Sequence, residues 1–438
     1  MKKNIIAIII IILLFSTVVY ANSFDNPKSM ALGDAYLTKA YGFQALDWNP
    51  ANLALVKHFV TINLIHANAQ FTNNSVNLNL YNDKVGKYWN ENDKEDILAK
   101  INDNGLELKL NAGASLPFIS FSVWKLALQN SVGAYSSLKL DKEYFRRILY
   151  GVECETEYNF PDNDGEAISY AESRIGYGDE IPLNLIIPSV EGLPKIYGGI
   201  SLGFIHGFQY GKIIDFHSRF STTGGAVSFK DSIVAKTAGY NSEEEKLSIE
   251  DSKIAGNGFR INIGFYSEIN ENITAGITFN NLFGSIKWSE DCERRIFSVS
   301  GDSLLFLNED FDDSLIVDTD TTYSIGSFKQ NIPFEIHLGG SYNLKGFDLT
   351  LDYVQGFDES AFTSKKPKIS FGVEYKPLQW LPLRLGFGFG EGKSSHFSFG
   401  SGFVLKNWEF NWAFRNYASP LLSHAKGFAF SIGSQLKF

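Results

Sequence analysis

The seven histidines are the first residues to weigh for catalysis or metal binding, because imidazole serves as a base and as a metal ligand. They stand at positions 58, 66, 206, 217, 337, 396 and 424. No two of them are spaced four apart to form a pair on one helix face, and no Gly-x-Ser-x-Gly sequence offers a nucleophile. His337 and His396 fall among serines, glycines and asparagines, as expected of hydrated side chains. The sequence therefore predicts no enzyme, no metal centre and no cofactor.

Two acidic stretches could be considered for Ca²⁺. Residues 222–256 contain Glu243-Glu244-Glu245, and residues 300–320 carry a run of aspartates. Their spacing matches no EF-hand loop. Charge runs are usually solvated, so we expect 222–256 and 289–332 to be external loops that could meet a protein partner.

The elements that position the remaining polar residues have a period of two. In residues 407–416, tryptophans and phenylalanines alternate with asparagine, glutamate and arginine, and 381–390 sets leucine and phenylalanine against arginine and glycine. Because successive side chains of a strand point to opposite faces, each run has an apolar face and a polar or glycine face. The candidate strands are 58–69, 74–82, 105–121, 123–139, 178–188, 196–213, 259–269, 273–288, 333–344, 347–356, 368–377, 381–390, 395–405, 407–416 and 427–438.

A soluble β-sandwich would also alternate, so length and connections must decide. The runs are about ten residues long, which a tilted strand needs to cross a bilayer. From residue 259 to the end, short joints such as 270–272 and 344–346 alternate with longer polar ones such as 355–367. Short turns on one side and long loops on the other are typical of outer-membrane barrels. The fold class is therefore predicted as all-β, an antiparallel up-and-down transmembrane barrel.

The number of strands is less certain, because the candidate set is odd whereas single-chain bacterial barrels have even numbers. We expect about fourteen, with the wrong assignment among the first 190 or so residues, and sixteen as the alternative. The barrel domain spans 58–438. Two segments, 93–101 and 141–150, have helical spacing, with Asp141 as an N-cap, and must lie outside the wall.

The faces opposite the apolar ones hold charge, which a wet lumen tolerates far better than the lipid face does. A salt-bridged interior and a polar conduit for a solute are both open interpretations. The predicted polar residues of the lumen are Arg260, Glu335, His337, Asp352, Glu374, Arg384, Glu409 and Arg415.

Composition and the N-terminus agree with export to an outer membrane. Residues 1–21 combine two lysines, an apolar run and small residues before a cleavage point after Ala21, which predicts a signal peptide, with an uncleaved anchor as the alternative. Aromatic residues make up 15% of the chain and glycines number 39. The net charge of −10 argues against nucleic acid as a partner. Two cysteines, Cys154 and Cys292, could pair, which the sequence leaves open.

Residues 22–57, ahead of the first strand, are too polar and helix-like for the wall. They contain many glycines and alanines and the turn-forming stretch DWNPANLAL at 47–55. Small residues permit close backbone approach. We therefore expect this segment to fold back into the lumen as a hatch, with glycine-rich inward faces making room for it.

The same segment resembles the N-terminal hatch of FadL-type outer-membrane proteins, a superfamily that includes long-chain fatty-acid and hydrocarbon channels and PorV-like secretion accessory proteins. The matching positions are Met30, Gly33, Ala35, Tyr36, Asn49, Pro50, Ala51 and Asn52. The resemblance implies a 14-stranded barrel with a luminal hatch. The acidic loops depart from a funnel for fatty-acid anions, so the resemblance bears on fold more than on substrate.

Two functions follow as hypotheses. The first is a channel for passive uptake of small, hydrophobic molecules across the outer membrane of a diderm bacterium. The second is a barrel that transports nothing and docks other proteins through loops 222–256 and 289–332. Outer-membrane lipids are expected partners in both cases. The terminal Phe438 resembles the signal by which barrels meet their insertion machinery.

Overall fold

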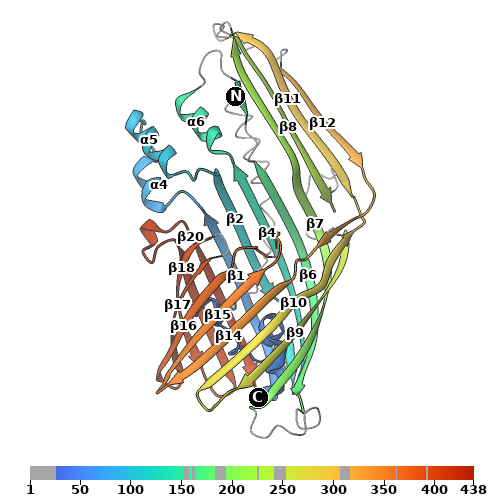
Figure 1. The fold of residues 1–438 in the computed structure, drawn as a ribbon, viewed down its shortest axis with the longest axis vertical. Coiled ribbons are helices and arrows are strands. Elements are labelled where there is room, and N and C mark those ends of the chain that lie inside the picture. Colours follow the sequence, from blue (N-terminus) through green and yellow to red (C-terminus); the bar gives the residue numbers. More distant parts are fainter. Residues whose placement is uncertain are drawn as a thin grey trace.

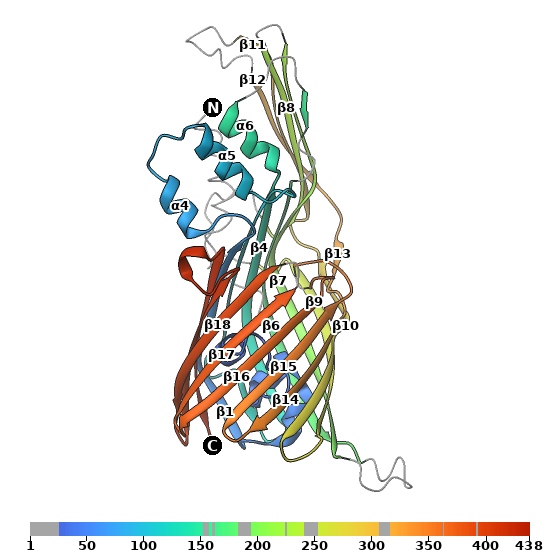
Figure 2. The ribbon, with the colours of Figure 1, turned by 60° about the vertical axis from the view of Figure 1, so that its left-hand side comes forward.

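The structure, a computed structural model, is a closed β-barrel with an extension above one end (Figures 1 and 2). It describes residues 26–151, 157–159, 163–182, 194–223, 226–240, 253–305, 316–361, 363–390 and 393–438. The predicted signal peptide and Cys154 lie outside these residues. Within them, no helix is both long and apolar enough to span a bilayer.

Fourteen antiparallel strands form the wall, which confirms the predicted fold class and strand number. The first strand pairs with the last, Ile62 opposite Leu436 and Phe71 opposite Phe428, so the sheet has no open edge there. The wall strands are β1 (Val60–Asn73), β2 (Leu106–Ser115), β4 (Leu126–Leu140), β6 (Asp164–Glu180), β7 (Ile196–Thr223), β9 (Gly256–Glu268), β10 (Ile273–Trp288), β14 (Glu335–Leu344), β15 (Phe347–Gly356), β16 (Lys368–Leu378), β17 (Leu381–Gly390), β18 (Lys393–Val404), β19 (Trp408–Tyr417) and β20 (Gly427–Lys437).

Alternating burial along the strands follows the predicted two faces. On β20, Phe428 and Phe430 are exposed on the outside, whereas Ser431 and Gln435 are buried inside. An outward apolar band is what a lipid environment requires of a barrel wall. Tight turns join strands at one end, for example the Lys345-Gly346 turn with φ of 45° and 96°. We call this the turn end, and the opposite one the loop end.

The second wall strand is interrupted. Its loop-end part, β2, pairs with β1 up to Ser115 opposite His66, and pairing resumes at Phe121 opposite Ile62 in the short strand β3 (Phe121–Val123). Residues 116–120 therefore stand opposite only 63–65 of β1. Backbone bonds still cross this offset, since Asn63 N donates to Ser120 O at 2.9 Å and Phe118 N donates to Asn63 O at 2.8 Å, and Asn63 Nδ2 adds a bond to Ser115 O at 2.9 Å.

The extension beyond the loop end is a second sheet that grows out of β7. It contains β5 (Glu157–Asn159), β8 (Ala226–Ala238), β11 (Glu293–Leu305) and β12 (Ile316–Ser324), while β13 (Phe328–Asn331) pairs with β10. A buried cluster centred on Trp288, Tyr210 and Tyr170 supports its base. The strands β8, β11, β12 and β13 lie within 222–256 and 289–332, so the prediction that these segments are loops was wrong.

Three helices also lie beyond the loop end: α4 (Leu78–Lys84), α5 (Glu91–Lys100) and α6 (Lys142–Tyr150). The latter two confirm the helices predicted at 93–101 and 141–150, and Asp141 caps α6 through the backbone N–H of Glu143. The predicted strand 74–82 was wrong. Its Val-Asn-Leu-Asn-Leu alternation imitates a strand, but Asn77 caps a helix by accepting from Leu80 N at 2.9 Å.

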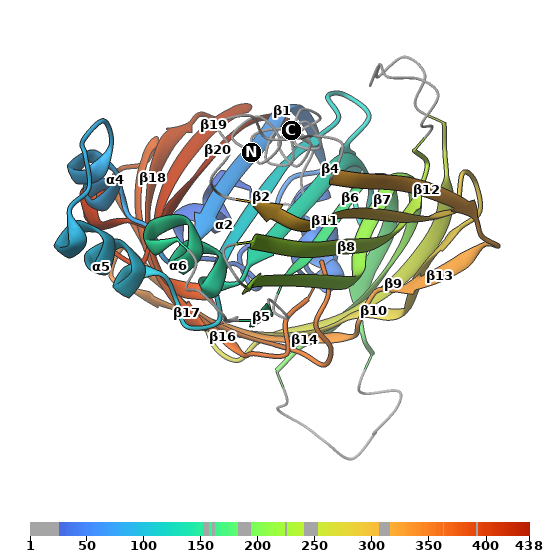
Figure 3. The ribbon, with the colours of Figure 1, turned by 90° about the horizontal axis from the view of Figure 1, so that it is seen from above.

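The first described residues, 26–56, form α2 (Pro27–Ala31), η1 (Gly42–Gln44), α3 (Ala45–Trp48) and η2 (Pro50–Leu55). Figures 2 and 3 show them surrounded by the wall strands. We call residues 26–56 the inner segment. Most of its side chains are buried, including Leu37 and Leu46 at 0% exposure, although it has no sheet partner of its own.

Candidate functional site

The interface between the inner segment and the wall is the candidate site, because most side chains of the inner segment are buried there. Glycines make this interface close. A Cβ on Gly386 would lie 2.0 Å from Gly33 N, and one on Gly199 would lie 2.3 Å from Pro50 C, so neither position accepts a side chain without movement. Further wall glycines whose Cβ would meet the inner segment within 3.0 Å are Gly176, Gly178, Gly264, Gly276, Gly339, Gly372 and Gly400.

The Asn-Pro-Ala-Asn stretch fixes the end of the inner segment to the wall. Asn49 Oδ1 accepts from Ala51 N at 3.0 Å and so caps η2, while Asn49 Nδ2 donates to Phe265 O on β9 at 2.9 Å. Asn52 Nδ2 donates to Leu37 O at 2.9 Å and to Ala40 O at 3.0 Å, which ties the two halves of the segment together. The turn ahead of the strands therefore attaches the inner segment to the wall.

A buried carboxylate at Asp34 forms the first of four polar contacts between the inner segment and the wall that centre on buried carboxylates. Arg415 on β19 donates to Asp34 Oδ1, and its Nη2 also lies 3.3 Å from Met30 O. Lys368 Nζ is 3.2 Å from Asp34 Oδ2, and His396 Nε2 is 3.9 Å from the same oxygen. Arginine and lysine thus hold one carboxylate from two strands, and neither charge is left alone in the interior.

The second contact has the opposite polarity, since the inner segment supplies the cation. Lys28 Nζ lies 2.9 Å from Glu409 Oε1 on β19, and Lys437 Nζ lies 3.4 Å from Glu409 Oε2. Tyr41 donates its hydroxyl to the same carboxylate, and Lys28 Nζ lies 4.1 Å from the centre of the Tyr41 ring. The glutamate therefore anchors both ends of the first half of the segment.

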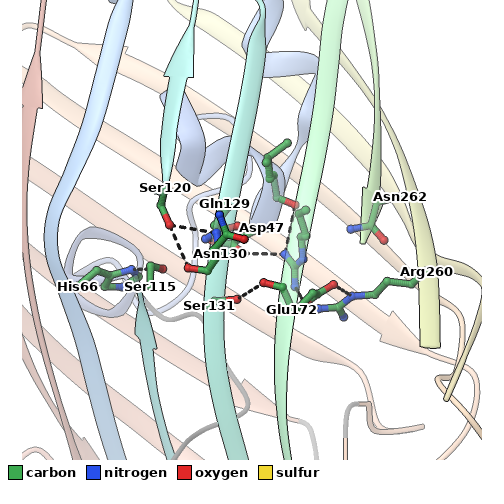
Figure 4. Close-up of polar contacts among 12 residues, drawn as sticks. Asp47, His66, Ser115, Ser120, Gln129, Asn130, Ser131, Glu172, Arg260 and Asn262 are labelled. Carbon is green, nitrogen blue, oxygen red and sulfur yellow. Dashed lines mark hydrogen bonds and ion pairs between the residues drawn. The ribbon is translucent and has the colours of Figure 1, made fainter. Parts of the chain in front are cut away.

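The third contact is a chain of charges across β6 and β9 (Figure 4). Arg174 Nη1 donates to Asp47 Oδ1 at 2.6 Å, and Arg174 Nη2 donates to Glu172 Oε2 at 2.8 Å. Arg260 donates to both oxygens of Glu172, from Nε to Oε1 at 2.6 Å and from Nη2 to Oε2 at 2.5 Å. Gln129 Nε2 donates to Asp47 Oδ2 at 2.6 Å. Paired charge-assisted bonds of this kind are among the stronger polar contacts in proteins.

The fourth contact joins a wall carboxylate to the backbone of the inner segment. Asp352 Oδ2 on β15 accepts from Tyr36 N and Leu37 N at 2.8 Å each. Its other oxygen, Oδ1, makes no hydrogen bond with any described residue. The Asp352 side chain therefore holds the backbone of the inner segment at Tyr36 and Leu37 through their amide groups.

The predicted lumen residues divide into two groups. Arg260, Asp352, Glu409 and Arg415 belong to the four contacts. The pair Glu374–Arg384, 2.5 Å apart, links neighbouring wall strands. Glu335 and His337 form a 2.7 Å pair, and the His337 ring lies 6.3 Å from that of Trp48 in the inner segment.

Several charged residues of the four contacts were not predicted from the sequence. Asp34, Lys28 and Asp47 lie in the inner segment, where isolated charges carry no periodic signal. Glu172 and Arg174 were missed with their strand, although the alternation in Arg174-Ile175-Gly176-Tyr177-Gly178 could have found it. The predicted hatch positions Met30, Gly33, Ala35, Tyr36, Asn49, Pro50, Ala51 and Asn52 all lie in the inner segment and are buried.

Histidine and cysteine side chains are the remaining candidates for chemistry among the described residues. Among the described residues, no group of three or more histidine, cysteine or acidic side chains could hold a metal ion. His66 Nδ1 lies 3.0 Å from Ser115 Oγ. Cys292 is buried beside the extension. What the interface can do chemically is hold or release the inner segment.

Comparisons with known proteins agree with this architecture. A model of a family of unknown function, DUF5723, matches residues 50–414. Among solved structures, the chain is similar to a deltaS2S3 mutant of the TodX monoaromatic hydrocarbon channel, with 11% identity, coverage of 95% of this chain and 99% of that chain, and a TM-score of 0.50.

Two further structures show lower scores. The Pseudomonas putida toluene transporter TodX has 11% identity and a TM-score of 0.48, covering 96% of this chain and 100% of that chain. A Pseudomonas aeruginosa FadL homologue has 11% identity and a TM-score of 0.47, with the same coverage. No curated protein matches. At such identities the likeness concerns the fold alone, a closed antiparallel β-barrel.

Proposed function

Because this chain belongs to the family of unknown function DUF5723, we propose its role from the barrel itself: passive uptake of small hydrophobic molecules across the outer membrane of a diderm bacterium. The inner segment is the hatch of this channel. The observation that carries the proposal is a barrel lumen occupied by a small-residue segment that four polar contacts hold to the wall. Permanent filler would more simply be an apolar core.

Polar contacts suit a movable hatch. A buried ion pair contributes little net stability compared with apolar packing, because desolvation offsets much of the attraction. Water that enters the lumen would solvate the released charges, so displacement costs less there than in a dry core. The wall glycines add no side chains of their own that would oppose a shift of the segment.

The interrupted strand offers an exit. The inner segment packs on this place through η1, where Phe43 N donates to Thr61 Oγ1 at 3.4 Å and Thr61 Oγ1 lies 2.7 Å from Ser122 Oγ. On the outside, Phe118 and Ile119 are exposed. A hatch movement at η1 would loosen the wall where its regular strand pairing is interrupted, and a hydrophobic molecule would leave sideways into the membrane.

Dye uptake tests the proposal. Cells that carry the chain would be compared with cells lacking it for the rate at which N-phenyl-1-naphthylamine fluorescence rises. The proposal expects a faster rise with the chain, and a rise that disappears when Gly42 and Phe43 are cross-linked to β1. Equal rates in all three strains would exclude uptake of this class of molecule.

The docking alternative rests on a specific observation. The strand β12 pairs only with β11 among the described strands, and residues 317–320 on it are all exposed. An unpaired strand edge is a template for a partner strand. Recovery of one stoichiometric protein with the intact chain, lost when Thr319 and Thr321 are replaced by proline, would favour docking over transport.

A further inference from the structure

An apolar surface lies beyond the loop end, outside the barrel and apart from the inner segment. It combines the helix α4, the turn that follows it and the 3-10 helix η5 (Leu422–His424) between β19 and β20. We call it the rim patch. Its exposed side chains are Leu78, Tyr81, Tyr88, Trp89, Leu421 and Leu422. Tyr88 is fully exposed at 105%, which is unusual for an aromatic residue in water.

The rim patch overhangs the outer side of the wall. The helix α4 packs on η5, and Figures 2 and 3 show α4 and α5 projecting beyond the outline of the barrel next to β18. By contrast, α6 lies over the barrel mouth in Figure 3. The patch therefore faces the space beside the barrel rather than its entrance.

The patch continues the lipid-facing band of the wall. Phe71 and Phe428 stand opposite each other near the loop ends of β1 and β20, with ring centres 6.3 Å apart, and both are exposed on the outside. The chain leaves β1 at Asn73 and enters α4 five residues later, at Leu78. Leu421 and Leu422 lie at the start of η5, a few residues before the chain enters β20 and reaches Phe428. Exposed apolar side chains thus stand both on the wall near its loop end and on the overhanging helix beyond it.

The residue types fit the boundary between hydrocarbon and headgroups. Tyrosine and tryptophan concentrate at this boundary, where their rings are buried and their polar atoms stay wet. Trp89 Nε1 already donates to Lys84 O at 2.8 Å, so its ring can enter an apolar layer without an unpaired donor. Exposed Lys87 and Lys100 flank the patch and can meet lipid phosphates.

We propose that the rim patch rests in the outer leaflet of the membrane and anchors α4 and α5 to the lipid surface. This inference needs the barrel to lie in a membrane but does not need it to transport anything. A patch that stays in water and a patch that protein covers would each give a result below that differs from lipid contact.

Site-directed spin labelling measures the contact directly. The full chain, with Cys154→Ser and Cys292→Ser, would carry a label at Tyr88→Cys and be reconstituted in vesicles of phosphatidylethanolamine and phosphatidylglycerol. The matched control is Ile148→Cys on α6, whose native side chain is also exposed, at 63%. Accessibility to oxygen and to a water-soluble nickel chelate would be compared by power saturation.

The proposal expects the label at 88 to meet oxygen more readily than nickel, with nickel accessibility at least about 3-fold lower than at 148, as for a side chain 5–10 Å below the headgroups. Equal nickel accessibility at both positions would place the patch in water. Low accessibility to both reagents would mean that protein covers it. Either result overturns the proposal.

A second measurement leaves both cysteines in place. The emission of Trp89 is obtained as the difference between the native chain and Trp89→Phe, in vesicles with and without lipids brominated near the headgroup. Lipid contact predicts strong quenching of this difference emission by the brominated lipid. An unchanged difference emission contradicts lipid contact.

Discussion

Gly33 and Gly386 meet backbone to backbone in the lumen, so closely that a Cβ on Gly386 would lie 2.0 Å from Gly33 N. Gly33 itself has φ of 65°, and a Cβ there would lie 2.7 Å from Phe387 N. These two glycines, more than 350 positions apart in the sequence, thus let the inner segment touch the wall without intervening side chains. This contact is where a small substitution should have the largest effect on closure.

Replacing Gly386 should unseat the inner segment. Gly386→Val forces the segment away from β17, so we expect faster hydrogen exchange over residues 30–37 and a measurable ion leak in planar bilayers. The matched control is Gly340→Val, where the nearest atom to a new Cβ is Thr274 O at 3.5 Å, an ordinary contact. A tight, fully protected Gly386→Val barrel would contradict the close packing described here.

Removing one partner of the Asp34–Arg415 pair should loosen the inner segment more than removing both. Asp34→Asn leaves Arg415 buried beside Lys368 without its carboxylate, a loss that costs about 3–5 kcal/mol in protein interiors. Exchange of the amides in 28–36 should then rise about 100-fold or more.

In the double variant Asp34→Asn/Arg415→Met the isolated arginine is absent, so much of the protection should return. Asp179→Asn serves as the control, because its 2.5 Å pair with Lys125 lies at a partly exposed site and joins two wall residues without involving the inner segment. Identical exchange in the single and double variants would argue against a charge-held contact.

Asn49→Ala tests the attachment of the inner segment to the wall at the Asn-Pro turn. The change removes the cap on Ala51 N and the bond to Phe265 O, so local opening of residues 49–55 should become easier by about 1–2 kcal/mol. Native-state hydrogen exchange measures this. Asn90→Ala removes an equivalent cap from the external helix α5, and it should leave 49–55 unchanged.

The extension should grow more stable in acid. Burial raises the pKa of the Asp231 carboxyl on β8, which accepts from Ser218 Oγ. The folded extension therefore binds a proton more tightly than the unfolded chain does, and its stability rises as pH falls from neutral through this raised pKa. Asp231→Asn should stabilise β7 and β8 at neutral pH and remove this dependence, whereas Asp320→Asn on the exposed face of β12 should do neither. Exchange rates corrected for intrinsic pH effects check both.

The last third of the barrel was predictable because lipid and lumen impose opposite polarities on alternate residues. The runs 347–356 and 381–390 coincide with β15 and β17 at both ends. The strand β6 was mostly missed for the same physical reason. In its loop-end half the inward Ile168 and Tyr170 are buried in an apolar cluster, and the outward face carries Ser169 and Ser173. The polarity of the two faces is reversed above the membrane, so a barrel pattern cannot find it.

The contacts of the inner segment could not be predicted, because they join residues far apart in the chain. Small residues at Gly33 and Ala35 indicated close packing, and the list of inward charges included Arg415 and Glu409. Their partners Asp34 and Lys28 become evident only in the structure, where β19 places Arg415 beside Asp34 and Glu409 beside Lys28.

The central claim is that residues 26–56 close an otherwise open lumen. The direct test is single-channel recording in planar bilayers of the chain with residues 26–56 deleted, after heat-modified migration on a gel has verified a closed barrel. The account predicts a steady open conductance for the deleted form and a silent intact barrel. Equal conductance of the two forms would contradict it.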